Sequence, residues 1–168
     1  IEFGIGSWEF KDFYNALKLG QDPDGQHYVP AFPYTAYNKM KDQDIIDLWT
    51  FWKTLPSSET PNVDHNLPFL FGFRRNIGVW KSLYMSDEFV NKDQDRATYL
   101  VEALAHCTEC HTPRNFIGAL ENAKWFEGAQ DPSGKGRIPG ITVQDLGWTK
   151  DEIVAVSYTH LTLPTRLS

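Results

Sequence analysis

The two cysteines of the chain lie in one five-residue motif, Cys107-Thr108-Glu109-Cys110-His111. A disulfide framework needs more cysteines than this, spread along the chain. Two thiols separated by two residues and followed directly by an imidazole instead indicate a single site that uses all three groups. Whatever occupies that site constrains how the surrounding chain can fold.

The spacing of the motif favours covalent attachment of a haem. The two vinyl groups of one porphyrin require two thiols at this separation, and the iron requires an imidazole that reaches it from the same turn. Cys107 and Cys110 would form the thioethers, and His111 would be the proximal iron ligand.

Two other interpretations of the motif stay open on the residues alone. A thioredoxin-like redox pair would follow a buried strand in a βαβ unit, whereas residues 96–106 have a helical pattern. A zinc site would need four ligands, which His106, His111 and the two thiols would supply, although the sequence has no second cluster at zinc-finger spacing. His106 is more simply a cation at the end of a helix.

The segment before the motif predicts an amphipathic helix that delivers Cys107 at its end. The helical spacing i, i+3, i+4, i+7 is occupied by Ala97, Leu100, Val101 and Leu104.

The composition indicates a folded chain and excludes several partners. The 168 residues include 16 Lys and Arg against 22 Asp and Glu, which gives a formal net charge of −6, and 41% are hydrophobic. An acidic chain without a cationic tract is a poor partner for nucleic acid or an anionic membrane surface. The longest uncharged apolar stretch, residues 67–73, is far shorter than the roughly 20 residues that cross a bilayer. No signal-peptide pattern or initiator Met is visible, so we expect that the first residue is not the natural one.

The residues around the motif resemble the cytochrome c superfamily. Residues 99–104 before the motif and Thr112-Pro113-Arg114-Asn115 after it are similar to multihaem c-type cytochrome subunits of periplasmic dehydrogenases. The resemblance implies an all-α fold of two partial cytochrome c domains, with short helices around haem and long loops. It also implies that Arg114 lines the haem edge and can pair with a propionate.

A weak internal repeat predicts two modules. Residues 4–16 and 145–155 each read as Gly, Trp and an acidic helix start, with Ser7 or Thr149 as the expected N-terminal acceptor. The haem motif precedes only the second copy, so we expect a fragment truncated at both ends.

The repeat divides the chain into four expected segments. Residues 1–57 would be the C-terminal part of a first cytochrome c domain that lacks its haem motif, and residues 58–92 an interdomain connection with a short helix at 76–84. Residues 93–155 would be the N-terminal part of the second domain, with the motif. Residues 156–168 match nothing in the first copy and would be a non-native tail.

Met40 is the candidate distal ligand of the first haem. It directly precedes a helix start at Asp42, and some family members carry Met where this chain has Phe32. The alternative for Met40 is an adaptable core residue. No Met follows His111, so the distal position of the second haem stays open.

Three further residues carry over from the resemblance. A backbone carbonyl near Pro139 would accept the N–H of the haem histidine, although Gly140 stands where the family usually has Asn. Trp8 and Trp148 match a superfamily Trp whose indole N–H reaches a propionate, and core packing without that bond is the equal alternative.

The resemblance implies an electron-transfer protein that carries covalent haem c, one motif in this chain and a second haem in the intact protein. It would relay electrons between a periplasmic dehydrogenase and a respiratory acceptor, in the periplasm, with membrane association only through a partner. A carrier, or the cytochrome subunit of an oxidoreductase, is favoured over an enzyme, and no catalytic residue is expected. The alternatives are a di-haem oxidoreductase of thiosulfate-dehydrogenase type and a haemless Cys-x-x-Cys redox or metal module.

Overall fold

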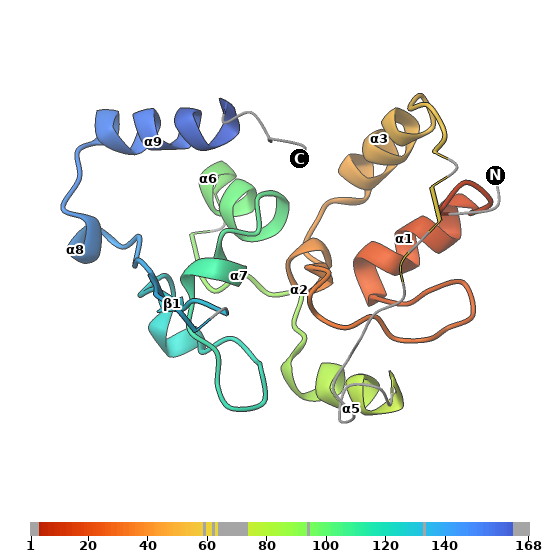
Figure 1. Ribbon diagram of the computed structural model, residues 1–168, viewed down its shortest axis with the longest axis horizontal. Coiled ribbons are helices and arrows are strands. Elements are labelled where there is room, and N and C mark those ends of the chain that lie inside the picture. The colour runs from red at the N-terminus through yellow and green to blue at the C-terminus, as the bar shows by residue number, and fades with distance from the viewer. Residues whose placement is uncertain are drawn as a thin grey trace. The chain divides into compact units, whose positions relative to one another are not determined.

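The computed structural model describes residues 4–58, 60–61, 63, 74–93, 95–132 and 134–162. These residues are mainly helical with long loops and one two-stranded sheet, so the expected all-α fold is confirmed (Figure 1). The chain divides into two compact units, residues 1–109 and 110–168. Much of the expected interdomain connection, including residues 64–73, lies outside the described residues.

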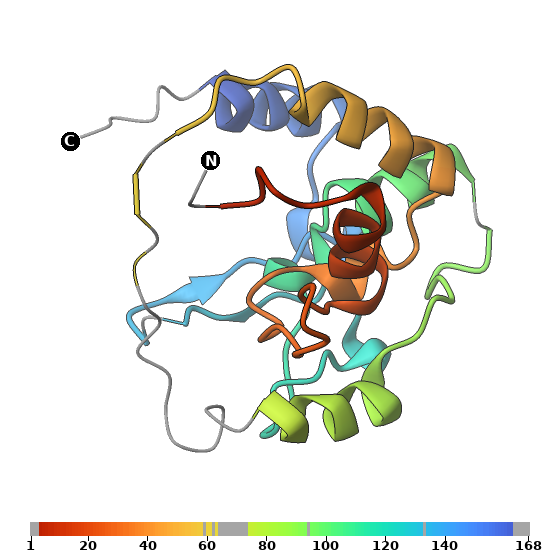
Figure 2. The same ribbon diagram turned by 90° about the vertical axis from the view of Figure 1, so that its right-hand side faces the viewer.

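Unit 1 consists of helices and the loops between them. Its elements are α1 (Phe10–Leu19), α2 (Tyr34–Tyr37), α3 (Asp42–Trp52), α5 (Arg74–Tyr84), α6 (Arg96–Tyr99) and the π-helical turn η1 (Leu100–Leu104). Figure 2 shows α1 (red), α3 (orange) and α5 (yellow-green) as three separate helices. The expected short helix at 76–84 is confirmed as α5, which begins two residues earlier.

The core of unit 1 lies between α1 and α3. Four buried side chains form it, Phe13, Leu17, Met40 and Ile45. α3 follows a helical spacing of apolar residues only in part: Ile45 is completely buried and Leu48 and Trp49 pack against the same cluster, whereas Trp52, the next residue in that spacing, is 44% exposed. Trp8 also packs at the edge of this core.

The two copies of the repeat begin their helices with different caps. α1 starts after Glu9, whose N–H donates to Asp12 Oδ2 at 3.0 Å. Ser7 is therefore not the cap, because the chain from Ser7 to Glu9 is not yet helical and α1 begins at Phe10. In the second copy the expected cap is present, since Thr149 Oγ1 accepts the N–H of Glu152 at 3.4 Å.

The buried face of the helix before the haem motif differs from the expected one. Ala97 and Leu100 are exposed, whereas Val101 and Leu104 are half-buried and Leu104 packs against the core. The fully buried residues of α6 and η1 are Thr98, Tyr99, Glu102 and Ala103. A π turn adds a residue to the turn and rotates the side chains that follow, which an α-helical pattern does not anticipate. The Glu102 carboxylate also has a reason to be buried, because it accepts the N–H groups of Val90 and Asn91 at 2.9 and 3.0 Å.

Lys81 attaches α5 to the end of α1. Its Nζ donates to the carbonyl oxygens of Leu19 and Gly20 at 2.5 and 2.8 Å and lies 4.7 Å from the ring centroid of Tyr34. Burial lowers the pKa of Lys81 to about 8. The charged amine is therefore held by two carbonyls and an aromatic face, but at a desolvation cost.

Lys81 is expected to make the free energy of unfolding depend on pH. An unfolded lysine keeps its proton up to about pH 10.4, so between about pH 8 and 10.4 the folded chain binds fewer protons than the unfolded chain. The free energy of unfolding should rise by roughly 1–2 kcal/mol from about pH 8 to 10, and this gain is lost as pH falls through 8. Urea unfolding of the wild type and of Lys81→Met, each at about pH 8 and pH 10, measures this change in the free energy of unfolding. Equal pH dependence in the two proteins would contradict this assignment.

Unit 2 is built around a short hairpin. After α7 (Thr108–His111), which continues from unit 1, it contains η2 (Asn122–Lys124), β1 (Ala129–Gln130), β2 (Arg137–Ile138), α8 (Val143–Leu146) and α9 (Lys150–Thr162). β1 and β2 are antiparallel, with Ala129 opposite Ile138. α9 runs across residue 155, where we expected the second domain to end.

No helix in the described part of the chain is both long enough and apolar enough to span a bilayer.

Candidate haem-attachment site

The Cys-x-x-Cys-His motif lies on a single helical turn, α7. Cys107 directly precedes this turn, and Cys110 and His111 are its last two residues. Within the described part of the chain neither cysteine is in a disulfide. A helical turn places residues three and four apart on one side, so both thiols and the imidazole are presented together.

His111 is oriented by a backbone carbonyl. Its Nδ1 lies 2.8 Å from the carbonyl oxygen of Pro139. A carbonyl can only accept, so Nδ1 carries the proton in this contact, and Nε2 is the nitrogen whose lone pair can bind a metal. The contact has the geometry that the resemblance implied for Pro139, while the part of Pro139 in haem binding stays a prediction.

The hairpin of unit 2 brings Pro139 to the histidine. Gly128 N–H donates to the carbonyl oxygen of His111 at 2.7 Å, and the chain then continues into β1. β2 returns antiparallel to β1 and ends directly before Pro139. His111 is therefore bound at both ends of the hairpin, through its own carbonyl and through its ring.

Thr112 helps to position the hairpin beside His111, a role that the sequence did not predict. It is completely buried, and its Oγ1 accepts the N–H of Phe126 at 3.1 Å, which ties the base of the hairpin to the residue after the haem histidine. Phe126 itself has a φ of 64°. The only local signal for this role was a threonine directly after the motif.

Gly128→Ala is expected to displace the hairpin from His111. Gly128 has a φ of 82°, and a Cβ there would lie 2.5 Å from the Ile138 carbonyl oxygen, so backbone would have to move. We expect Gly128→Ala to lower the free energy of unfolding by about 1–3 kcal/mol more than Gly134→Ala. Gly134 is the matched control, because its φ of 74° carries the same strain while a Cβ there meets nothing within 4 Å. Equal losses in the two variants would show that the close approach of Gly128 does not matter.

The departure at Gly140 has a structural reason. A Cβ at this position would collide with the carboxylate of Asp145. Asp145 is held there because Thr142 Oγ1 donates to its Oδ2 at 2.6 Å, and its own N–H donates back to Thr142 Oγ1 at 3.2 Å. An asparagine at 140 would therefore require the Asp145 side chain to move out of this arrangement.

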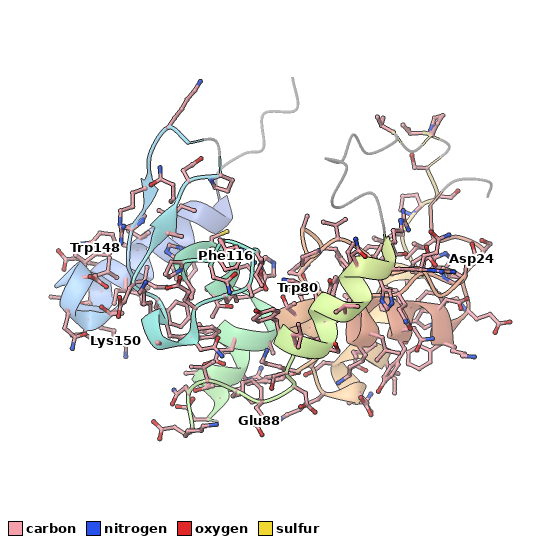
Figure 3. The ribbon with its side chains drawn as sticks, turned by 90° about the horizontal axis from the view of Figure 1, so that it is seen from below. Asp24, Trp80, Glu88, Phe116, Trp148 and Lys150 are labelled. Carbon is pink, nitrogen blue, oxygen red and sulfur yellow. The ribbon has the colours of Figure 1, made fainter. Side chains whose placement is uncertain are left out.

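The segment after the motif forms a closed loop. Arg114 pairs with Leu120 as an isolated bridge, and its guanidinium donates to the Gly118 carbonyl oxygen at 2.8 Å. Phe116 lies at the end of this loop with 98% of its surface exposed (Figure 3). Arg114 is exposed too, and its contact with a haem propionate stays a prediction.

The two predicted tryptophans lie in different surroundings. Trp148 lies on the surface of unit 2, two residues before Lys150 at the start of α9, and is 45% exposed (Figure 3). Trp8 is half-buried against the core of unit 1. The position of Trp8 is consistent with core packing, the alternative to a propionate contact. The propionate contacts of both tryptophans stay predictions.

Met40 lies beside a cavity in unit 1. Met40 is 5% exposed, and the cavity next to it has a volume of about 610 Å³. Its walls come from α1, α2, the loops before and after α2, α3 and η1. They are formed by Phe13, Leu17, Phe32, Tyr37, Met40, Asp44, Asp47, Leu48, Phe51, Trp52 and Leu104. The walls are mainly apolar and the volume is within the range of cofactor pockets, roughly 300–1,000 Å³.

Comparison with known proteins shows which kind of protein the chain resembles. The chain is 40% identical over 157 residues to a protein named diheme cytochrome c-type from Cereibacter sphaeroides, which is 90% of this chain and 53% of the relative. It is 39% identical over 147 residues to the fructose dehydrogenase cytochrome subunit of Gluconobacter japonicus, 83% of this chain and 30% of the relative. The chain belongs to the c-type cytochromes.

A third relative agrees, the gluconate 2-dehydrogenase cytochrome c subunit of Pantoea cypripedii, which is 30% identical over 159 residues, 89% of this chain and 34% of the relative. No protein-family model matches the chain. The chain spans about half the length of the first relative and about a third of the other two. These relatives do not favour the haem-enzyme or the haemless interpretation.

Membership of the c-type cytochromes implies covalently bound haem c. The residues of α7 fit that group. Both thiols are outside disulfides, and the proton of His111 is held on Nδ1 by Pro139, which leaves Nε2 as the available ligand atom.

Proposed function

We propose that this chain is part of an electron-transfer cytochrome, with haem c attached to Cys107 and Cys110 and His111 as the proximal ligand. A bound haem c supplies one-electron chemistry, because its iron cycles between the ferric and ferrous states. The observation that carries the proposal is the motif on one turn together with the hydrogen bond from His111 Nδ1 to the Pro139 carbonyl.

The residues of the site would have separate roles. The two thioethers anchor the group, and the carbonyl of Pro139 fixes the ring orientation and raises the basicity of His111. Arg114 and Trp148 would bind the propionates through the guanidinium and the indole N–H.

The partner would be a dehydrogenase that passes electrons to this protein in the periplasm, and the acceptor would be a respiratory component. Support comes from the names of the relatives, which include cytochrome subunits of fructose and gluconate dehydrogenases. Membrane association would come through that partner.

The intact protein would contain a second haem, held by a first module to which residues 1–57 belong. The cavity beside Met40 supports this, because an apolar pocket with a buried thioether in its wall is suited to the distal side of a haem. Trp8 would serve that module as Trp148 serves the other. Residues 58–92 would connect the modules, residues 93–155 would belong to the second, and residues 156–168 would be non-native.

Met40→Leu is expected to lower one reduction potential in the intact two-haem protein, because a thioether ligand raises the potential of haem iron. The exchange conserves volume, so the free energy of unfolding should change by less than about 1.5 kcal/mol. Spectroelectrochemical titration of the two haems measures the potentials. Met85→Leu is the control for removing a thioether elsewhere, and unchanged potentials in Met40→Leu would leave Met40 as a core residue.

The proposed function is tested on the chain itself. It would be expressed with the haem-attachment machinery of a c-type cytochrome host, and the pyridine haemochrome spectrum and intact mass would be measured. We expect one haem per chain, bound through thioethers and reversibly reducible by one electron. A chain that matures beside a positive-control cytochrome but carries no covalent haem would overturn the proposal.

A further inference from the structure

Helix α2 contacts the turn that carries the first cysteine of the motif. The Thr35 hydroxyl donates to the carboxylate of Glu109. The Tyr37 ring meets the His106 ring edge to face, with centroids 5.7 Å apart and planes at 82°. All four residues belong to unit 1. Two residues of α2 therefore contact the turn on both sides of Cys107, Tyr37 at His106 before it and Thr35 at Glu109 after it.

The conformation of His106 determines where Cys107 lies. His106 has a φ of 44°, an unfavourable value for a residue with a Cβ, which costs of order 1 kcal/mol or more. Its carbonyl oxygen accepts the Glu109 N–H at 3.0 Å, and the Cys107 N–H donates to the Val101 carbonyl at 3.1 Å. A strained residue at this point persists only if neighbouring groups hold it.

The α2 residues are themselves fixed in place. Lys39 Nζ donates to the Thr35 carbonyl oxygen at 2.8 Å. Tyr37 is half-buried, and burial followed by the nearby charge of Glu109 raises the pKa of its hydroxyl. Tyr34, the first residue of α2, is completely buried. The contacts with His106 and Glu109 therefore come from a rigid element.

A second set of contacts joins the same two segments beyond Met40. The Tyr99 hydroxyl accepts the Lys41 N–H at 2.9 Å and donates to the carboxylate of Asp44. Lys41 Nζ also lies 4.9 Å from the centroid of the Tyr99 ring. Met40 is thus flanked on both sides in the sequence by residues that hold the segment leading to Cys107.

We propose that Thr35 and Tyr37 are positioning residues that hold the segment His106–Glu109, which carries Cys107, against the loop bearing Met40 within unit 1. The inference rests on the proposed haem site for its functional meaning. It assigns a role to His106 and Glu109, two residues beside the haem-bonding cysteines that make no bond to haem. A change in the Met40 loop would then alter the environment of the haem on Cys107 without touching that haem's ligands.

Hydrogen exchange of the haem-loaded chain tests the inference. Tyr37→Leu and Thr35→Val should each speed hydrogen exchange at the Cys107 and Glu109 amides at least tenfold. The reason is that the hydrogen bonds of these two N–H groups depend on the turn being held in place. Tyr37→Phe keeps the ring and Thr35→Ser keeps the hydroxyl, so both should restore slow exchange. The circular dichroism of the Soret band should change in the first pair and recover in the second.

Tyr28→Leu is the matched control, because Tyr28 lies in the same unit and its ring packs edge to face on Phe32. It should leave both amides unchanged. A double-mutant cycle of Thr35→Val with Glu109→Ala should be non-additive, since the two changes remove the same bond. Unchanged exchange in Tyr37→Leu and Thr35→Val would overturn the inference. A wild type without covalent haem would instead overturn the proposed function. The same exchange comparison on the haem-free chain would then show whether Thr35 and Tyr37 hold the turn.

Discussion

Replacing Cys107 and Cys110 together by alanine is expected to abolish covalently bound haem. The two thiols are the only cysteine side chains in the chain, so the variant has no group left that can form a thioether. His111 alone would hold haem only by coordination, which denaturation in acid reverses. We expect the intact mass to lose one full haem relative to wild type, and the acid–acetone extract to contain all of the haem that remains.

Single variants sharpen this result. Cys107→Ala and Cys110→Ala should each keep one thioether, which the pyridine haemochrome spectrum distinguishes from two because one vinyl group stays unreacted. Phe116→Ala is the control, because Phe116 lies just beyond the motif and is almost fully exposed. Covalent haem in the double variant would place the attachment outside the motif and refute the assignment.

The local chemistry of the site could be read from the sequence, because the spacing of the thiols and the histidine is itself the chemical requirement. The buried side of α3 follows a similar local rule, since Ile45, Leu48 and Trp49 repeat with the period of a helix, although Trp52, the next residue in that spacing, is 44% exposed. In both cases the informative residues are neighbours in the chain, and the rules that relate them are local.

The features that the residues alone did not predict depend on contacts between residues that are distant in the sequence. The contact between His111 and Pro139 was expected only from the resemblance, and the hairpin that makes it depends on positive φ values at Phe126 and Gly128. The buried face of α6 and η1 was missed because a π turn shifts the helical period and a buried carboxylate, Glu102, binds a loop. No periodicity in the sequence encodes either feature.

The contacts of α2 with His106 and Glu109 are likewise contacts between residues that are distant in the sequence. Thr35 and Tyr37 are separated from Glu109 and His106 by more than half the length of unit 1, and their short segment has no helical periodicity of its own. Sequence reasoning considered His106 only as a helix-end cation or a metal ligand. The structure instead gives it an aromatic partner and a left-handed backbone.

Ile45→Ala is expected to cause the largest loss of stability of any single change proposed for unit 1. Ile45 is completely buried in the cluster that includes Phe13, Leu17 and Met40. Removing its side chain takes away apolar burial and leaves a cavity, which typically costs about 2–5 kcal/mol. A domain of this size has a free energy of unfolding of roughly 5–15 kcal/mol, so the variant should lose a large fraction of its stability.

The neighbouring residue provides the control. Ile46 has the same side chain on the same helix but is 41% exposed, so Ile46→Ala should change the free energy of unfolding by at most about 0.5–1 kcal/mol. Urea unfolding of the haem-free chain, followed by tryptophan fluorescence, measures both variants. Trp49 packs against the same cluster and reports on it directly. Equal losses at the two positions would mean that the contacts of α3 in solution are not those that bury Ile45, and the wall of the Met40 cavity that α3 supplies would have to be reassigned with them.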